Sequence, residues 1–205
     1  MDTTVSPTPA WRSLLRPLIT TRGYTALTHH LLGLPLGVVY FTWLVTGLAT
    51  GLGLAITLLG IPLLTLVFAT VRPLLAGERA MSNALLGTSI AAAPLAPGGE
   101  GWIARFKAYW TDSATWRGIT YLLLRFPIGT ATFTVAVATY ATALYLIAAP
   151  IVAPFDTIEL GIWEPNTVLE GLALVPLGAT VLVASGWISE GMAAMSRALA
   201  RWGAR

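Results

Sequence analysis

The stretch HHLLGLPLGVVYFTW, residues 29 to 43, leads into a run without a single charge, from Leu31 to Val71. A helix needs about 20 residues to cross the hydrocarbon core of a bilayer, so this run is long enough for two crossings joined by a tight turn. Two further uncharged runs cover residues 126–155 and 171–189, and each is long enough for one crossing. The sequence therefore predicts four membrane-spanning helices and an all-α fold.

The composition agrees with a membrane protein. Of the 205 residues, 56% are hydrophobic and only 10% are charged, and the mean hydropathy is +0.74. A soluble globule of this size needs far more polar surface. The first span is not expected to be a cleavable signal peptide, because it begins well inside the chain and a second span follows at once. The absence of cysteine excludes disulfides and thiolate metal sites.

The distribution of charge predicts the orientation, because arginine and lysine near span ends stay on the cytoplasmic side. The charged residues in the connection of residues 154–171 are all acidic, so this connection should lie outside. Both termini and the middle connection should be cytoplasmic. The net charge of +3 then combines a basic inner face with an acidic outer loop, which favours contact with the anionic inner leaflet of the plasma membrane and no nucleic acid partner. The basic residues are Arg12, Arg16 and Arg22 before the first span; Arg72, Arg79, Arg105, Lys107, Arg117 and Arg125 around the middle connection; and Arg197, Arg201 and Arg205 in the tail.

The two halves of the chain resemble each other. YLLLRFPIGTATFTV, residues 121 to 135, matches the opening stretch at an offset of 92 residues, and AMSNAL at 80–85 matches AMSRAL at 194–199 at an offset of 114. The sequence therefore predicts two tandem hairpins related as a parallel repeat. The predicted segments are a cytoplasmic N-terminus (1–22), a first hairpin with an amphipathic extension (23–92), a cytoplasmic hinge and aromatic helix (93–116), and a second hairpin (117–205) with an external loop (153–170).

Prolines stand at matching places in the two predicted hairpins. A proline removes an amide donor and disfavours helical geometry in the residue before it, so a kink or a helix start is expected at each. The neighbouring glycines, Gly33, Gly37 and Gly129, allow another backbone to come close. Helix packing is the favoured interpretation, and a ligand cleft or simple helix initiation are the alternatives. The predicted helix breaks are Pro35, Pro62, Pro127 and Pro176.

Two cytoplasmic segments have an amphipathic pattern, with methionine and leucine on one face and polar residues on the other. Anchorage to anionic lipid is their simplest role. Transmission of a conformational change is the alternative, and for it the candidate output surface comprises Met81, Asn83, Met195 and Arg197.

Aromatic and basic residues alternate in WIARFKAYWTDSATWRGITY, residues 102 to 121, which is the composition of a membrane-interface belt. Within it, Asp112 or Ser113 is suited to cap the helix that leads into the third span.

Few residues suggest chemistry. No phosphate loop, zinc-ligand spacing or nucleophile motif is present, so we expect no catalytic residue, cofactor or metal. His29 and His30 are expected at the membrane interface beside Arg22, with axial haem ligation as the alternative. Glu78 and Arg79 are interpreted as a solvated or headgroup pair.

Two groups of charged residues remain as candidate sites. A candidate interhelix ion pair joins Glu190 to Arg72 or Arg79. The candidate external ligand loop contains Asp156, Glu159 and Glu164, and a simply solvated loop is the alternative.

A family resemblance rests on ordered pieces that cover nearly the whole chain. RGYTALTHHLLGLPLGVVYFTWLVTGLATGLGLAITLLGIPLL (22–64), Arg72, the Glu78–Arg79 pair and WTDSATWRGITYLLLRFPIGTATFTV (110–135) resemble the sensor domain at the N-terminus of many actinobacterial, and some archaeal, membrane histidine kinases. His29 and His30 stand where that family commonly has a tyrosine. The resemblance implies a membrane-embedded input module with no assigned ligand. In those proteins a dimerisation helix and an ATPase domain follow, and neither is expected here before Arg205.

The sequence thus predicts a non-catalytic sensor or regulatory module that couples an external or membrane stimulus to a partner. The expected partners are a histidine kinase or another membrane or cytoplasmic protein, and a homo-oligomer is a further option. The competing hypotheses are a small permease or accessory transporter subunit, and a lipid-binding scaffold.

Overall fold

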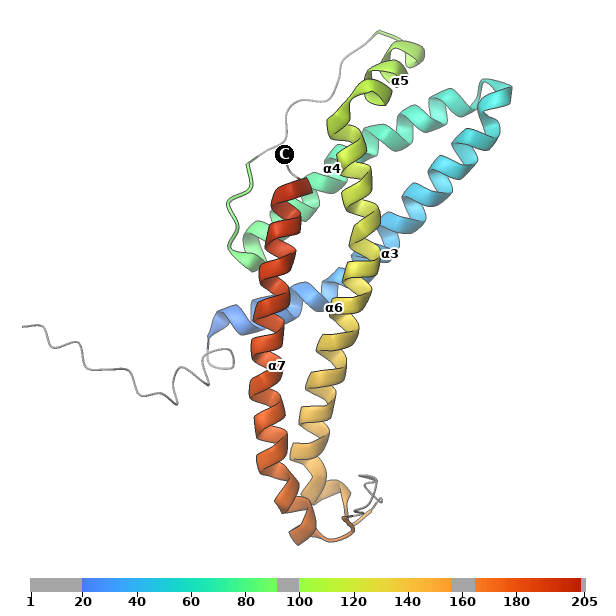
Figure 1. Ribbon diagram of the computed structural model, residues 1–205. Coiled ribbons are helices and arrows are strands. Elements are labelled where there is room, and N and C mark those ends of the chain that lie inside the picture. Colours follow the sequence, from blue (N-terminus) through green and yellow to red (C-terminus); the bar gives the residue numbers. More distant parts are fainter. Residues whose placement is uncertain (1–19, 92–99, 156–164, 204–205) are drawn as a thin grey trace, which may run out of the picture. The chain divides into compact units, whose positions relative to one another are not determined.

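The computed structural model describes residues 20–91, 100–155 and 165–203, and these are helical with no strand among them (Figure 1). The predicted all-helical fold is therefore confirmed for this part of the chain. The helices are α3 (Thr21–Gly53), α4 (Gly60–Leu86), α5 (Trp102–Thr111), α6 (Ser113–Val152) and α7 (Val168–Gly203), with a short 3-10 helix, η1 (Leu54–Thr57), after α3.

Four of these helices are long and apolar enough to cross a membrane. They cover Gly23–Thr57, Gly60–Leu86, Ser113–Val152 and Val168–Trp202. The prediction of four spans is therefore confirmed by length and composition, and the chain has the make-up of a multi-pass membrane protein. The external ligand loop residues, Asp156, Glu159 and Glu164, lie outside the described residues, as does most of the predicted hinge.

The predicted helix breaks do not end helices. Pro35 and Pro176 lie inside α3 and α7, Pro127 falls within α6, and Pro62 lies in the first turn of α4. A proline near the start of a helix is tolerated because the first amides have no partner within the helix. Prolines inside membrane-type helices are tolerated because neighbouring groups satisfy the freed carbonyl. A kink at each proline stays a prediction.

The described residues form two compact units. One contains residues 28–133 together with 192–203, and the other contains residues 20–27 together with 134–191. The assignment of the chain to two tandem hairpin repeats stays a prediction.

In the first of these units, α3 and α4 form a closely packed hairpin. A Cβ atom on Gly47 would lie 2.6 Å from Val67 Cγ2, and one on Gly51 would lie 2.6 Å from Leu64 Cδ2, so a larger residue at either position would force the facing side chain to move. The turn passes through Leu58, whose φ of 61° lies in the left-handed region that costs a branched side chain energy. The core of the unit joins α3, α4, α5 and α6 and contains Tyr40, Leu44, Leu64, Val67, Phe68, Val71, Tyr109, Ile119, Tyr121 and Leu122.

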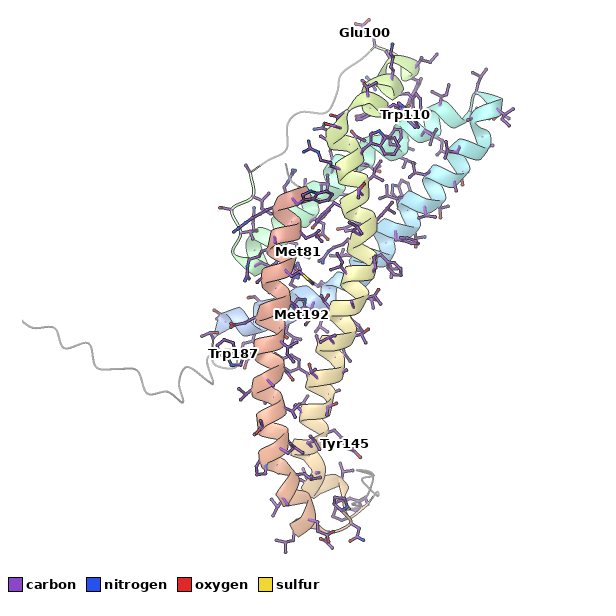
Figure 2. The ribbon with its side chains drawn as sticks, in the orientation of Figure 1. Met81, Glu100, Trp110, Tyr145, Trp187 and Met192 are labelled. Carbon is purple, nitrogen blue, oxygen red and sulfur yellow. The ribbon has the colours of Figure 1, made fainter. Side chains whose placement is uncertain are left out.

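Aromatic rings hold α5 against α4 in the same unit. Phe68 of α4 lies 6.0 Å from Phe106 and 6.1 Å from Trp110, measured between ring centroids, and Figure 2 shows Trp110 at the end of α5. Trp110 also meets Trp116 of α6 edge to face at 5.1 Å. The predicted aromatic helix of the middle connection is therefore confirmed as a helix. Its placement at a membrane surface stays a prediction.

In the other unit, α6 and α7 approach each other through glycines. A Cβ atom on Gly171 would lie 2.6 Å from Pro150 Cα, and one on Gly178 would lie 2.9 Å from the Ile147 amide nitrogen. The small core here contains Leu146, Ala149, Ala153 and Leu174. Short side chains at these positions allow the two backbones to pack closely.

Candidate functional site: a buried charged cluster on three helices

The most unusual feature of the structure is a buried ion pair between α4 and α6. Arg125 Nε lies 3.2 Å from both carboxylate oxygens of Glu78, and the two side chains are only 3% and 2% exposed. Charged side chains are almost never buried this completely unless they are paired. The interpretation of Glu78 and Arg79 as a solvated pair is therefore wrong for Glu78, which turns inward to Arg125.

Two further side chains complete the cluster. The Tyr121 hydroxyl donates to Glu78 Oε2 at 3.4 Å, and Arg125 Nη2 lies 3.3 Å from His29 Nε2. Tyr40 is close enough to Glu78 and Arg125 to interact electrostatically with both. The buried cluster, defined as His29, Glu78, Tyr121 and Arg125, thus joins α3, α4 and α6.

The contact with Arg125 determines the protonation of the His29 ring. A guanidinium group carries donors only, and each neutral imidazole has one donor and one acceptor nitrogen. His29 Nε2 must therefore accept the hydrogen bond from Arg125, which leaves the proton on Nδ1. His29 Nδ1 is itself buried and has no hydrogen-bond partner among the described residues.

Both adjacent histidines are buried, at 1% exposure each. Their rings meet edge to face with centroids 5.7 Å apart. Protein therefore surrounds both rings, and the ring of His29 is turned toward Arg125. Their expected placement at the membrane interface stays a prediction. No group of three metal-ligating side chains occurs in the part of the chain that the structure describes, and His29 Nε2, one of the two nitrogens that could bind haem, faces Arg125.

Glycines bring the three helices close enough for these contacts. On α6, a Cβ atom on Gly118 would lie 2.7 Å from Leu75 Cδ1 of α4, and one on Gly129 would lie 2.7 Å from the Gly33 carbonyl carbon of α3. Gly37 has similarly little space beside Phe126, at 2.8 Å from its Cα. The interpretation of Gly33, Gly37 and Gly129 as packing positions is therefore confirmed, and Gly118 is a further packing position that was not predicted.

These contacts also show the direction of α6. Gly118 lies beside Leu75 and Arg125 beside Glu78, so α4 and the first part of α6 run parallel. Consecutive spans joined on one membrane face would run antiparallel. α6 continues as one helix to Val152, so this parallel course differs from the order that the predicted topology gives to the second and third spans. The orientation of the chain therefore stays a prediction.

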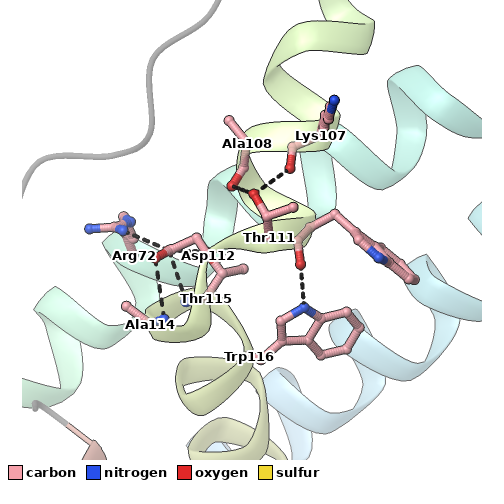
Figure 3. A network of polar contacts seen from close by, with 9 residues as sticks. Arg72, Lys107, Ala108, Thr111, Asp112, Ala114, Thr115 and Trp116 are labelled. Carbon is pink, nitrogen blue, oxygen red and sulfur yellow. Dashed lines mark hydrogen bonds and ion pairs between the residues drawn. The ribbon is translucent and has the colours of Figure 1, made fainter.

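A second polar network lies at the break between α5 and α6 (Figure 3). Asp112 Oδ2 accepts hydrogen bonds from the Thr115 amide at 3.0 Å and the Thr115 hydroxyl at 2.7 Å, and Oδ1 accepts from the Ala114 amide at 3.3 Å. The predicted cap by Asp112 is confirmed. Arg72 Nη2 of α4 lies 2.9 Å from the same carboxylate, so this cap also ties α6 to α4.

The pKa of Asp112 is lower than the ordinary carboxyl value. Partial burial acts to raise this pKa, but the hydrogen bonds from Thr115, Ala114 and Arg72 outweigh it because they favour the charged form. A depressed carboxyl pKa stabilises the folded state above the ordinary pKa, and the stabilisation is lost as the pH falls through the lowered value.

Replacing Asp112 tests this cap. We expect Asp112→Ala to lower the free energy of unfolding by about 1 kcal/mol at neutral pH, as for other helix caps. Asp112→Asn keeps a capping oxygen and loses the charge, so it should cost less. The difference between wild type and Asp112→Asn should shrink as the pH falls below the ordinary value of 3.8. Equal losses for both variants at every pH would contradict this account.

The four candidate output residues differ in their exposure and in their hydrogen bonds. Met81 of α4 and Arg197 of α7 are half-buried, and Met195 is 55% exposed. Asn83 is engaged at the end of α4, because its Oδ1 accepts from the Ile90 amide at 3.0 Å and from the Thr88 hydroxyl at 2.8 Å. Asn83 therefore shapes the chain after α4, and the role of the four residues in output stays a prediction.

The predicted ion pair of Glu190 also stays a prediction. Arg72 pairs with Asp112, Arg79 is half-buried, and Glu190 belongs to the other compact unit.

Comparison with protein families gives one match. A family model described as "Putative sensor" matches residues 29–202, which include every residue of the buried cluster. Neither the curated proteins nor the solved structures provide a match. The matched region is most of the chain, and it begins at His29, the α3 member of the cluster. The chain therefore belongs to the "Putative sensor" family, which indicates a sensory and non-catalytic role.

Proposed function

We propose that this chain is a non-catalytic sensor module of the plasma membrane that couples an external or membrane stimulus to a partner protein. The observation that carries the proposal is the buried Glu78–Arg125 pair, to which α3 adds His29. A packed hydrophobic core would hold the same helices without the expense of desolvating two charges. The ion pair can instead distinguish two arrangements of the helices, because it strongly stabilises the arrangement in which it forms and is absent from the other.

The energetics of such a pair suit a switch. Separating the partners of a buried ion pair leaves an uncompensated charge in an apolar region, which costs about 3–5 kcal/mol. Small shifts between α3, α4 and α6 are therefore converted into two discrete arrangements. A stimulus can shift their balance only by the difference in its affinity for the two.

The output of the module is expected on α4 next to the cluster and on the repeated segment of α7. Met81 follows Glu78 on α4 by less than one turn, and Met195 lies on the repeated segment of α7. Methionine side chains adapt to varied apolar partners. In the predicted topology both termini and this surface are cytoplasmic, and Arg197 lies near anionic lipid, which contributes about 1 kcal/mol per basic residue. The acidic loop with Asp156, Glu159 and Glu164 would then meet external stimuli.

Copurification from gently solubilised host membranes tests the proposal. We expect the tagged chain to retain a histidine kinase or response regulator. The double variant Met81→Asp, Met195→Asp should lose that partner while still inserting. The matched control is Val168→Asp with Leu169→Asp, which places the same two charges on exposed residues at the opposite end of α7. Retention of an ATPase subunit instead would favour a transporter, and unchanged binding by the double variant would exclude this output surface.

A further inference from the structure

We infer that the stimulus is the proton itself and that His29 is the residue that binds it. This inference rests on the proposed sensor function and names the ligand of the buried cluster. The carrying observation is the geometry at His29, where a neutral ring is held between a permanent cation and a protein interior without acceptors.

Protonated His29 would have no acceptor in its present position. Both ring nitrogens of an imidazolium are donors. The Nε2 proton would point at Arg125 Nη2, which lies 3.3 Å away and is also a donor. The Nδ1 proton has no acceptor among the described residues. A proton on His29 therefore replaces a hydrogen bond by a contact between two cations.

The charges around His29 do not compensate such a proton. The charged or titratable groups that act on it directly are Arg125 of α6 and His30 of its own helix. The one acid in the cluster, Glu78 of α4, is already paired with Arg125 and accepts a hydrogen bond from Tyr121. Tyr40 of α3 lies near this pair and contributes a neutral hydroxyl, so it adds no negative charge. The cluster is neutral with neutral His29 and carries one buried positive charge after protonation, which is strongly unfavourable in an apolar surrounding.

Protonation of His29 should break the contact between α3 and α6. His29 is the α3 member of the cluster, and one turn further along α3 the backbones of Gly33 and Gly129 touch. Glu78 and Arg125 remain paired across α4 and α6 whatever the state of His29. Acidification should therefore separate α3 from α6 and leave the α4–α6 contact intact. Histidine is the side chain that changes charge between about pH 5 and pH 8.

Spin labels across the α3–α6 contact report this movement. Phe41 of α3 and Phe126 of α6 have ring centroids 4.8 Å apart, and the chain has no natural cysteine, so Phe41→Cys with Phe126→Cys gives a unique pair. The labels are attached at neutral pH to the full chain in lipid nanodiscs, and their magnetic coupling is followed from about pH 8 down to about pH 4, because a site that disfavours the imidazolium delays proton uptake beyond the ordinary histidine range. We expect strong coupling at high pH and its loss in a one-proton transition at low pH.

Substitutions at the two histidines separate a proton switch from a general effect of acid. Glutamine can accept from Arg125 through its side-chain oxygen and cannot take up a proton, so His29→Gln should keep the coupling at every pH. His29→Arg places a permanent cation that carries donors only there, and it should remove the coupling at every pH. The matched control is His30→Gln, which changes the neighbouring buried ring and should retain the transition. If His30→Gln does not fold, His30→Asn serves the same purpose.

A spectroscopic measurement reads the ring directly. In the His30→Gln chain, His29 is the remaining histidine, and its ¹⁵N ring shifts should show the Nδ1–H tautomer at high pH and an imidazolium once the labels separate. The opposite tautomer, or a coupling transition that persists in His29→Gln, would overturn the inference. If no transition occurs but the Met81 and Met195 variant still loses its partner, the sensor function stands and the proton is not its stimulus.

Discussion

Arg125→Met is expected to lower the free energy of unfolding by about 3–5 kcal/mol, the usual cost of removing one partner of a buried ion pair. Methionine replaces much of the arginine stem, so the loss comes mainly from Glu78, which is 2% exposed and would be left without its cation. Reversible unfolding by dodecyl sulfate in mixed micelles, followed by fluorescence of the eight tryptophans, measures this change.

Two controls separate the ion pair from simple loss of an arginine. Arg72→Met removes the arginine of the more exposed pair, in which Arg72 and Asp112 are 15% and 23% exposed, so it should cost about 1 kcal/mol or less. The double variant Glu78→Met, Arg125→Met buries neither charge and should unfold close to wild type. A double variant as unstable as Arg125→Met alone would show that packing, and not the unpaired carboxylate, determines the loss.

The sequence was sufficient to predict the helices because hydrophobicity and charge act locally. Uncharged runs of about 20 residues or more require helices in a bilayer, and the run from Leu31 to Val71 becomes α3 and α4. The cap by Asp112 was equally predictable, because the carboxylate of an aspartate ahead of a helix accepts hydrogen bonds from the first amides regardless of the rest of the fold.

The buried cluster could not be predicted in this way because it depends on which helices meet. Glu78 stands beside Arg79 in the sequence, and the two together are typical of a solvated pair. The structure instead pairs Glu78 with Arg125, 47 positions later. One signal was present: Tyr121 and Arg125 are four residues apart and share a face of α6, directly before an uncharged run. An arginine directly beside an apolar run of a helix calls for an acidic partner.

The second large effect is expected at Gly129, where α6 meets α3. A Cβ atom there would lie 2.7 Å from the Gly33 carbonyl carbon and closer still to the Gly33 oxygen. These are backbone atoms that cannot rotate away, so Gly129→Ala must push the two helices apart. Overpacking of this kind costs about 1–3 kcal/mol, and Gly129→Val should cost more.

The opposite glycine provides a sharp comparison, because the contact is not symmetric. A Cβ atom on Gly33 would meet Gly129 Cα at 3.5 Å and Arg125 Nη1 at 3.6 Å, which are ordinary van der Waals distances, so Gly33→Ala should be tolerated. Gly77→Ala in α4, where a Cβ atom meets nothing within 4 Å, should stabilise the chain by about 0.5–1 kcal/mol through helix propensity. Mixed-micelle unfolding ranks the three variants. Because Gly129 lies one turn beyond Arg125 on α6, Gly129→Ala should also weaken the Arg125–His29 contact. A Gly129→Ala chain as stable as wild type would show that α3 and α6 do not meet as described.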